Sequence, residues 1–212
     1  MSGLAAVIFD MDGTLIDSST VVPDAYIASI QRLGGPAYDR EQIVASYRLG
    51  PPRTILSHLL GRQCGDTELG EYHAQLASEA HRLRIFPGVP EVLNALVGVL
   101  PRAVFSGASL RACSILLESV DLRRHFDVVV GGDEVALPKP APHGILLTCE
   151  RLGVKPEAVA YVGDAPVDVE AARRSGAVAV AAAWGHQYSP QAPADCALEE
   201  PGDLLALLAV DP

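Results

Sequence analysis

The chain has 212 residues, which suits one domain or a domain carrying an insertion. Apolar residues make up 49% of it and charged residues 20%, and no apolar run approaches the roughly 20 residues of a membrane helix. A disordered or membrane-spanning protein is therefore not expected. The formal net charge of −10 would repel a polyphosphate backbone, so nucleic acid is not expected as a partner.

The four cysteines lie far apart and form no C-x-x-C pair, which argues against a zinc cluster or a small disulfide scaffold. No basic segment precedes the short apolar stretch at the N-terminus, so we expect no secretory signal there. Reduced thiols and a cytoplasmic enzyme are the expectation. The sequence leaves both a monomer and a homodimer open.

Residues 4–9 form an apolar run rich in β-branched and aromatic side chains, which predicts a strand buried on both faces. In residues 17–83 the apolar residues instead recur at helical spacing. Glycine and proline at 34–36 and 50–52 divide this segment into several helices. We predict that residues 17–83 are all helix.

Beyond residue 86, predicted strands and helices alternate. Strands are expected at 102–105, 127–130, 159–162 and 177–182, and helices at 90–100, 110–120, 143–152, 167–175 and 203–209. Such alternation is typical of a Rossmann-like parallel sheet with helices on both faces. The predicted fold class is therefore α/β, with a core domain of residues 1–16 and 84–212 and a small helical domain of residues 17–83 inserted after the first strand.

Two acids follow the first predicted strand. Ligands of such a sheet bind beyond the carboxyl ends of the strands, and residues i and i+2 of an extended chain share a face, so Asp10 and Asp12 would project into one crevice. The alternative is that Asp12-Gly13 is the turn of a hairpin, for which Asp-Gly is a strong signal. This motif alone leaves both interpretations open.

Two further strand ends carry polar groups. Ser106-Gly107 offers a hydroxyl and an exposed backbone N–H that could bind an anion, although Ser106 could equally cap the next helix. Lys139 stands between two prolines, which restrict its backbone. Only two of the 16 basic residues are lysines, so a lysine at this position is itself informative.

The fourth strand end places Asp164 at its tip and Asp168 in the first turn of the following helix. Helix capping would explain either residue alone. Four carboxylates gathered at one sheet edge would repel one another, however, by about 4 kcal/mol for a pair about 4 Å apart at an effective dielectric near 20. An oxygen-only carboxylate set suits Mg²⁺, and with Lys139 nearby we predict a site for a divalent cation and a phosphoryl dianion together.

These motifs, in this order, resemble the haloacid dehalogenase-like hydrolase superfamily, and within it the phosphoglycolate phosphatase-like branch with a helical C1-type cap. The resemblance rests on residues 10–18 (Asp-Met-Asp-Gly-Thr-Leu-Ile-Asp-Ser), Ser106, Lys139-Pro140 and Gly163-Asp164 with Asp168. It implies that Asp10 is a nucleophile that forms an aspartyl-phosphate. It also implies that Asp12 is the general acid for the leaving oxygen and later the base that activates water.

The resemblance also implies the remaining roles. Mg²⁺ would be held by Asp10, the backbone carbonyl of Asp12, Asp164 and Asp168, the last directly or through water. The phosphoryl group would be bound by Gly13, Ser106, Gly107 and Lys139, and Arg53 of the inserted segment is a candidate contact to substrate. Gly107 stands where the family usually has Asn, which leaves the orientation of the substrate open.

The expected function is Mg²⁺-dependent hydrolysis of a small phosphorylated metabolite. Relatives that cleave carbon–halogen bonds lack an acid at the position of Asp12, and phosphonatase-like relatives need a cap lysine, of which residues 17–83 have none. A phosphomutase is disfavoured because Val21 and Val22 stand where mutases carry a histidine. A receiver-like phospho-acceptor domain needs neither Asp12 nor the insertion. The substrate, phosphoglycolate-like or a sugar phosphate, stays open.

Overall fold

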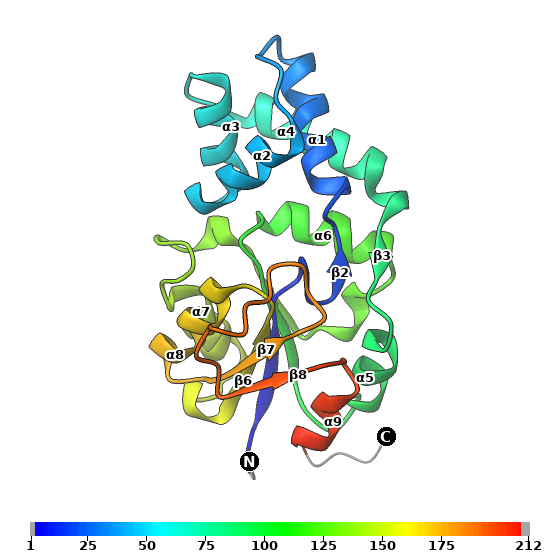
Figure 1. Ribbon diagram of the computed structural model, residues 1–212, viewed down its shortest axis with the longest axis vertical. Helices are drawn as coiled ribbons and strands as arrows, with labels where there is room; N and C mark the ends of the chain where they lie inside the picture. Colours follow the sequence, from blue (N-terminus) through cyan, green and yellow to red (C-terminus); the bar gives the residue numbers. More distant parts are fainter. Residues whose placement is uncertain (1–2, 209–212) are drawn as a thin grey trace.

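A six-stranded parallel sheet organises the lower half of the molecule in the computed structural model, which describes residues 3–208 (Figure 1). The strands lie in the spatial order β5 (Val128–Val130), β4 (Arg102–Phe105), β1 (Ala6–Phe9), β6 (Val159–Gly163), β7 (Val178–Ala182) and β8 (Cys196–Leu198). Every neighbouring pair is parallel. The predicted α/β class is thus confirmed.

Helices cover both faces of this sheet. The central strand β1 is buried at every position, and because its side chains alternate, Val7 and Phe9 enter one apolar cluster while Ala6 and Ile8 enter the other. The first cluster includes residues of α5 (Val89–Ala95), α6 (Leu110–Ser119) and α9 (Asp203–Leu208), and the second includes residues of α7 (His143–Leu152) and α8 (Pro166–Ser175). Three single-turn helices, η3 (Arg123–His125), η4 (Gly132–Glu134) and η5 (Pro156–Ala158), complete this part.

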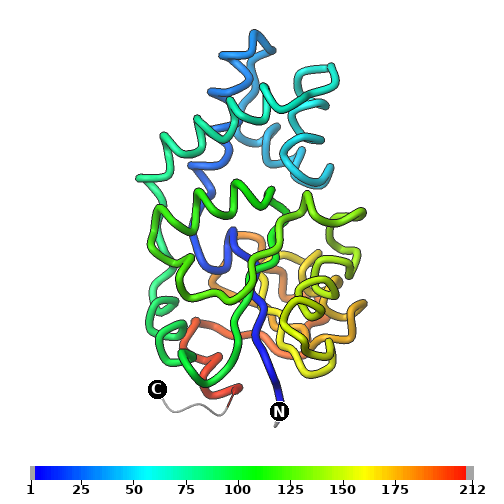
Figure 2. The backbone as a smooth tube through the Cα atoms, turned by 180° about the vertical axis from the view of Figure 1, so that it is seen from behind, coloured from blue at the N-terminus to red at the C-terminus, as the bar shows by residue number. Residues whose placement is uncertain are grey.

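A helical segment stands above the carboxyl ends of the strands (Figures 1 and 2). It consists of α1 (Val21–Arg32), α2 (Arg40–Ser46), η1 (Tyr47–Leu49), α3 (Pro52–Leu60), α4 (Asp66–Glu79) and η2 (Ala80–Arg82). We call residues 17–83 the cap. The division between the cap and a core of residues 1–16 and 84–212 stays a prediction.

The cap is joined to the core by a two-stranded antiparallel ribbon. Its strands are β2 (Ile16–Asp17) and β3 (Arg84–Ile85), and Asp17 lies opposite Arg84. The prediction that residues 17–83 are all helix is therefore wrong at Asp17. Two-residue strands are too short to show the alternation by which a strand is recognised.

The other differences from the predicted elements have local causes. The helix expected at 90–100 ends at Ala95, because the chain turns through Gly98 at a φ of +73°, and the side chains of Val97 and Val99 are 59% and 52% exposed. The edge strand β8 was not predicted, since its three residues carry no periodic signal. Of the helix expected at 203–209, Ala209 lies outside the described residues. No helix of residues 3–208 is long and apolar enough to cross a membrane.

Candidate active site

The carboxyl end of β1 carries the two predicted acids into the space below the cap. The N–H of Asp10 donates to the carbonyl of Val162 at 2.8 Å, which extends the pairing with β6 and holds the side chain at the centre of the sheet edge. Asp10 is only 6% exposed, and Asp12 is partly buried. Asp10 therefore lies at the centre of the sheet edge, largely removed from solvent water.

The chain beyond Asp12 turns back tightly. The N–H groups of Leu15 and Ile16 both donate to the carbonyl of Met11, at 2.9 and 3.1 Å, and Gly13 has a φ of +82° that favours glycine. Strand β2 then pairs with β3 and not with β1. Asp12-Gly13 is therefore not the turn of a hairpin.

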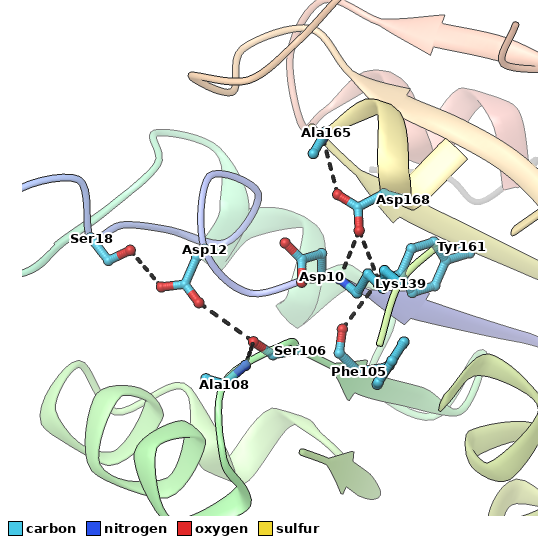
Figure 3. A network of polar contacts seen from close by, with 10 residues as sticks. All are labelled: Asp10, Asp12, Ser18, Phe105, Ser106, Ala108, Lys139, Tyr161, Ala165 and Asp168. Atoms are coloured by element: carbon cyan, nitrogen blue, oxygen red, sulfur yellow. Dashed lines mark hydrogen bonds and ion pairs between the residues drawn. The ribbon is translucent and has the colours of Figure 1, made fainter. Parts of the chain in front are cut away.

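Lys139 lies between two of the acids (Figure 3). Its Nζ is 2.6 Å from Asp10 Oδ1 and 2.7 Å from Asp168 Oδ1, and its side chain is 9% exposed. Burial lowers the pKa of Lys139, but the charges of Asp10 and Asp168 outweigh it and hold this pKa well above its usual range. Lys139 is thus a fixed positive charge against the buried carboxylate of Asp10.

Two aromatic rings enclose the ammonium group of Lys139. Its Nζ lies 5.0 Å from the ring centroid of Phe105 and 5.4 Å from that of Tyr161, within the range of cation–π attraction. The Tyr161 hydroxyl lies 3.1 Å from the carbonyl oxygen of Phe105 and 3.3 Å from Asp168 Oδ1. Tyr161 therefore links the end of β4 to the helix that carries Asp168.

Asp164 and Asp168 complete a group of three carboxylates with Asp10. One oxygen from each lies within 4.8 Å of the others, and all three residues are buried. Asp168 Oδ2 accepts from the N–H of Ala165 at 3.0 Å, so Asp168 does cap its own helix while its other oxygen faces Lys139. Of the four carboxylates predicted to converge at this sheet edge, these three form one group and Lys139 contacts two of them, whereas Asp12 is not part of the group.

Asp164 is held differently. Its Oδ2 accepts from the N–H of Gln187 at 2.9 Å, whereas its Oδ1 is buried without a hydrogen-bond partner among the described residues. Burial raises the pKa of Asp164 to about 6. An orphaned carboxylate oxygen beside two further carboxylates is a donor set that fits Mg²⁺, which prefers oxygen ligands.

Asp12 faces away from this group, toward two hydroxyls. Ser18 Oγ donates to Asp12 Oδ1, and Ser106 Oγ lies 3.4 Å from Asp12 Oδ2. Burial raises the pKa of Asp12, while these two hydrogen bonds lower it. A carboxyl group with a raised pKa can hold a proton nearer neutral pH, as a general acid must.

A family model described as haloacid dehalogenase-like hydrolase matches residues 4–176. The chain belongs to this family. It is 31% identical to the phosphoglycolate phosphatase of Chromobacterium violaceum, over 97% of this chain and 96% of the relative. It is also 31% identical to the phosphoglycolate phosphatase of Aquifex aeolicus, over 97% of each chain.

The fold has a close structural counterpart. The crystal structure of CbbY from Rhodobacter sphaeroides, determined in complex with phosphate, superposes on this haloacid dehalogenase-like hydrolase with a TM-score of 0.84, at 23% identity, over 98% of this chain and 100% of the other. The sheet with its helices and cap is thus the fold of this hydrolase family. The family model and the two relatives identify the chain as a hydrolase of the phosphatase branch.

Three of the residues predicted to bind the phosphoryl group or the substrate donate no hydrogen bond to the three carboxylates within residues 3–208. They are Arg53, Gly107 and Gly13. Arg53, on α3, donates to Asp66 and to the carbonyl of Cys64 within the cap, so its predicted contact to substrate stays untested. Gly107 is exposed, and a Cβ there would meet no atom within 4 Å. A Cβ at Gly13 would lie 2.3 Å from Asp164 Oδ2, so glycine lets the two loops approach.

Several residues that shape the site were not predicted. Ser18 stands in the quoted first motif, yet nothing in its spacing signals the bond to Asp12. Tyr161 is one apolar position of a buried strand, and its link to Phe105 joins residues 56 apart in sequence. Gln187 contributes only a backbone N–H, which any residue but proline would supply. Contacts of these kinds require the three-dimensional arrangement of the strands.

Proposed function

We propose that this hydrolase is a Mg²⁺-dependent phosphatase that cleaves a small phosphorylated metabolite, phosphoglycolate-like or a sugar phosphate, through an aspartyl-phosphate on Asp10. The observation that carries the proposal is the placement of Asp10 and Asp12 on one loop, with Lys139 2.6 Å from Asp10 and two hydroxyls on Asp12. A nucleophile beside a fixed cation and a separate proton donor are what phosphoryl transfer to a carboxylate needs.

In the first half of the reaction an Asp10 carboxylate oxygen attacks phosphorus. The bond from phosphorus to the leaving-group oxygen breaks, and that oxygen takes the proton held by Asp12, which releases the free alcohol. Lys139 offsets the negative charge that the phosphoryl group brings next to Asp10. Ser106 and the N–H groups near Gly13 and Gly107 are the proposed donors to the remaining phosphoryl oxygens.

In the second half Asp12, now ionised, takes a proton from a water molecule whose oxygen attacks phosphorus. The bond between phosphorus and the Asp10 oxygen breaks, so inorganic phosphate departs and the Asp10 carboxylate is restored. The hydroxyls of Ser18 and Ser106 support both forms of Asp12, because a hydroxyl donates to the carboxylate and can rotate to accept from the protonated acid. Ser18 and Ser106 thereby keep the Asp12 carboxyl group oriented in both its protonated and its ionised form.

Asp10, the backbone carbonyl of Asp12, Asp164 and Asp168 are the proposed ligands of Mg²⁺, and the orphaned Oδ1 of Asp164 supports that role. When bound, Mg²⁺ supplies positive charge that stabilises the charge developing on the transferred group. The buried carboxylates alone would oppose the approach of a phosphate dianion. The positive charges of a divalent cation and of Lys139 would together offset this repulsion and favour binding of the dianion.

The cytoplasm is the proposed compartment, supported by the four cysteines, all of which are free thiols. Small phosphorylated metabolites are the proposed partners, in keeping with the negative net charge that disfavours nucleic acid.

Release of inorganic phosphate from para-nitrophenyl phosphate and from a panel of phosphorylated metabolites tests the proposal. We expect repeated turnover with Mg²⁺, loss of turnover with EDTA, and loss in Asp10→Asn. Full activity of Asp10→Asn would show that Asp10 is not the nucleophile. Stoichiometric phosphorylation without release would instead favour a phospho-acceptor domain.

A further inference from the structure

A short loop after strand β7 contacts both the candidate metal site and the ribbon that carries the cap. The chain leaves β7 at Ala182, and residues 184–187 (Trp-Gly-His-Gln) rise toward β2 (Figure 1). We call these four residues the 184–187 loop. The proposed reaction uses none of their side chains, so their contacts call for a separate explanation.

The 184–187 loop packs closely on Asp164. The N–H of Gln187 donates to Asp164 Oδ2 at 2.9 Å, whereas Asp164 Oδ1 has no hydrogen-bond partner among residues 3–208. A Cβ on Gly185 would lie 2.1 Å from the Cβ of Asp164 and 2.5 Å from the carbonyl oxygen of Gly13, so only glycine lets the loop pass this close. The loop and a cation would therefore hold one carboxylate by its two oxygens.

The same loop holds the ribbon through His186. Its Nε2 lies 3.0 Å from Asp17 Oδ1, and because an ionised carboxylate only accepts hydrogen bonds, the imidazole is the donor. The His186 ring also packs against Phe86, the residue that follows β3, with ring centroids 5.6 Å apart. His186 thus contacts the chain where it leaves the core for the cap and beside the point where it returns.

Trp184 fixes the start of the loop to the core. Its Nε1 donates to the carbonyl of Thr14 at 3.0 Å, and its side chain packs against the apolar cluster that includes Phe9. Thr14 lies between Asp12 and β2 in the chain. The loop is thereby anchored to the core at both Trp184 and Asp164, and His186 between these anchors contacts the ribbon.

We infer that His186 is a positioning residue of the proposed reaction, and that the 184–187 loop couples a divalent cation at Asp164 to the position of the cap. A cation that fixes the Asp164 carboxylate also orders the loop, and His186 extends this order to the ribbon. Coupling between two sites is reciprocal, so a ribbon held by His186 in turn favours binding of the cation. The inference rests on the proposed function and adds to it a link between the metal site and the cap.

The experiment adds Mg²⁺ alone to the metal-free protein and follows hydrogen–deuterium exchange of the backbone. The segments compared are residues 15–20 and 82–88, which contain the ribbon, and residues 160–170 around Asp164. In the wild-type protein we expect Mg²⁺ to slow exchange in all three segments. In His186→Ala, Mg²⁺ should slow exchange only around Asp164, and the Mg²⁺ concentration that gives half of this protection should rise about fivefold.

Two further variants make the comparison specific. His186→Gln keeps an N–H donor that can reach Asp17, so it should restore most of the protection of the ribbon. His81→Ala replaces an exposed histidine of the cap and should behave as the wild type does. Thermal unfolding in EDTA accompanies each variant, because it separates a loss of metal-free stability from a loss of coupling.

Three results would overturn the inference while leaving the phosphatase intact. The first is a wild-type ribbon that Mg²⁺ does not protect, and the second is equal protection of the ribbon in His186→Ala and the wild type. The third is an unchanged Mg²⁺ affinity in His186→Ala, which with a lowered metal-free Tm would mark His186 as purely structural. Failure of the proposed function looks different, because the wild-type protein would then release no phosphate from any substrate tested.

Discussion

Lys139 balances the charge of the site. It is one of two lysines in the chain, and its Nζ contacts Asp10 and Asp168 while Phe105 and Tyr161 flank it. A compact ammonium can sit between two carboxylates where the broad, planar group of arginine would not fit in the same way. Removing it would leave two buried carboxylates facing each other.

We therefore expect Lys139→Met to destabilise the metal-free protein by about 3 kcal/mol or more, the usual cost of breaking a buried ion pair. Added Mg²⁺ should recover part of the loss by returning positive charge to the carboxylates. Urea unfolding in EDTA and in Mg²⁺ measures both effects. Lys155→Met is the control, since Lys155 is exposed and its replacement should change stability by less than about 0.5 kcal/mol. Equal stability of the two variants would contradict the assigned role.

The sequence located the acids and Lys139 because each follows a strand, and parallel strands bring their carboxyl ends to one edge. It could not locate groups that act through a backbone atom or across the sheet, such as the N–H of Gln187 on Asp164. Arg53 stays a candidate contact to substrate, and the sequence could not show that Asp66 and the carbonyl of Cys64 accept its hydrogen bonds in this structure.

Elements with a strong internal pattern were predicted well. Strand β4 and helix α7 have the predicted bounds, 102–105 and 143–152. The ribbon strands and β8 were missed, because two or three residues cannot display a period and depend on their neighbours for pairing. Long-range packing thus determines the short elements, whereas local pattern determines the long ones.

The packing of α7 against β4 depends on Gly144. A Cβ on this residue would lie 2.0 Å from the ring of Phe105, which flanks Lys139. We expect Gly144→Ala to destabilise the protein by about 1–3 kcal/mol, the range for overpacking a core, and to lower activity by displacing that ring.

Gly70→Ala is the matched control. Gly70 is an exposed residue inside α4, and a Cβ there would meet no atom within 4 Å. This substitution should stabilise the protein by up to about 1 kcal/mol, because alanine favours a helix more than glycine does. Urea unfolding of both variants measures the difference, and a Gly144→Ala protein as stable as the wild type would argue against close packing of α7 on β4.

The protein has a formal net charge of −10, and several of its acidic side chains are buried. Burial raises the pKa of Asp10, Asp12 and Asp164, the last to about 6. The folded state therefore binds these protons more tightly than the unfolded chain does. The stability that Asp164 contributes in this way is complete below about pH 4 and is lost as the pH rises through about 6.

We expect the metal-free wild type to lose stability relative to Asp164→Asn as the pH rises from about 4 to 7, by up to about 3 kcal/mol for a two-unit shift. Asparagine can still accept from Gln187 but carries no charge. Mg²⁺ should raise the Tm of the wild type at pH 7 and much less that of Asp164→Asn, since a ligand of the folded state stabilises it. Thermal unfolding across pH, with EDTA or Mg²⁺, gives both comparisons. Parallel curves for the two proteins would rule out Asp164 as the titrating group.

The ribbon of β2 and β3 also bears on how such an enzyme can diversify. The chain leaves the core at Asp17 and returns to it at Arg84, which pairs with Asp17. The two ends of the segment between them therefore lie side by side. A longer, shorter or unrelated insert could replace this segment without moving β1, the strand that leads into Asp10. If the cap selects the substrate, as proposed for Arg53, selectivity can change with the insert while the carboxylates and Lys139 at the sheet edge keep their places.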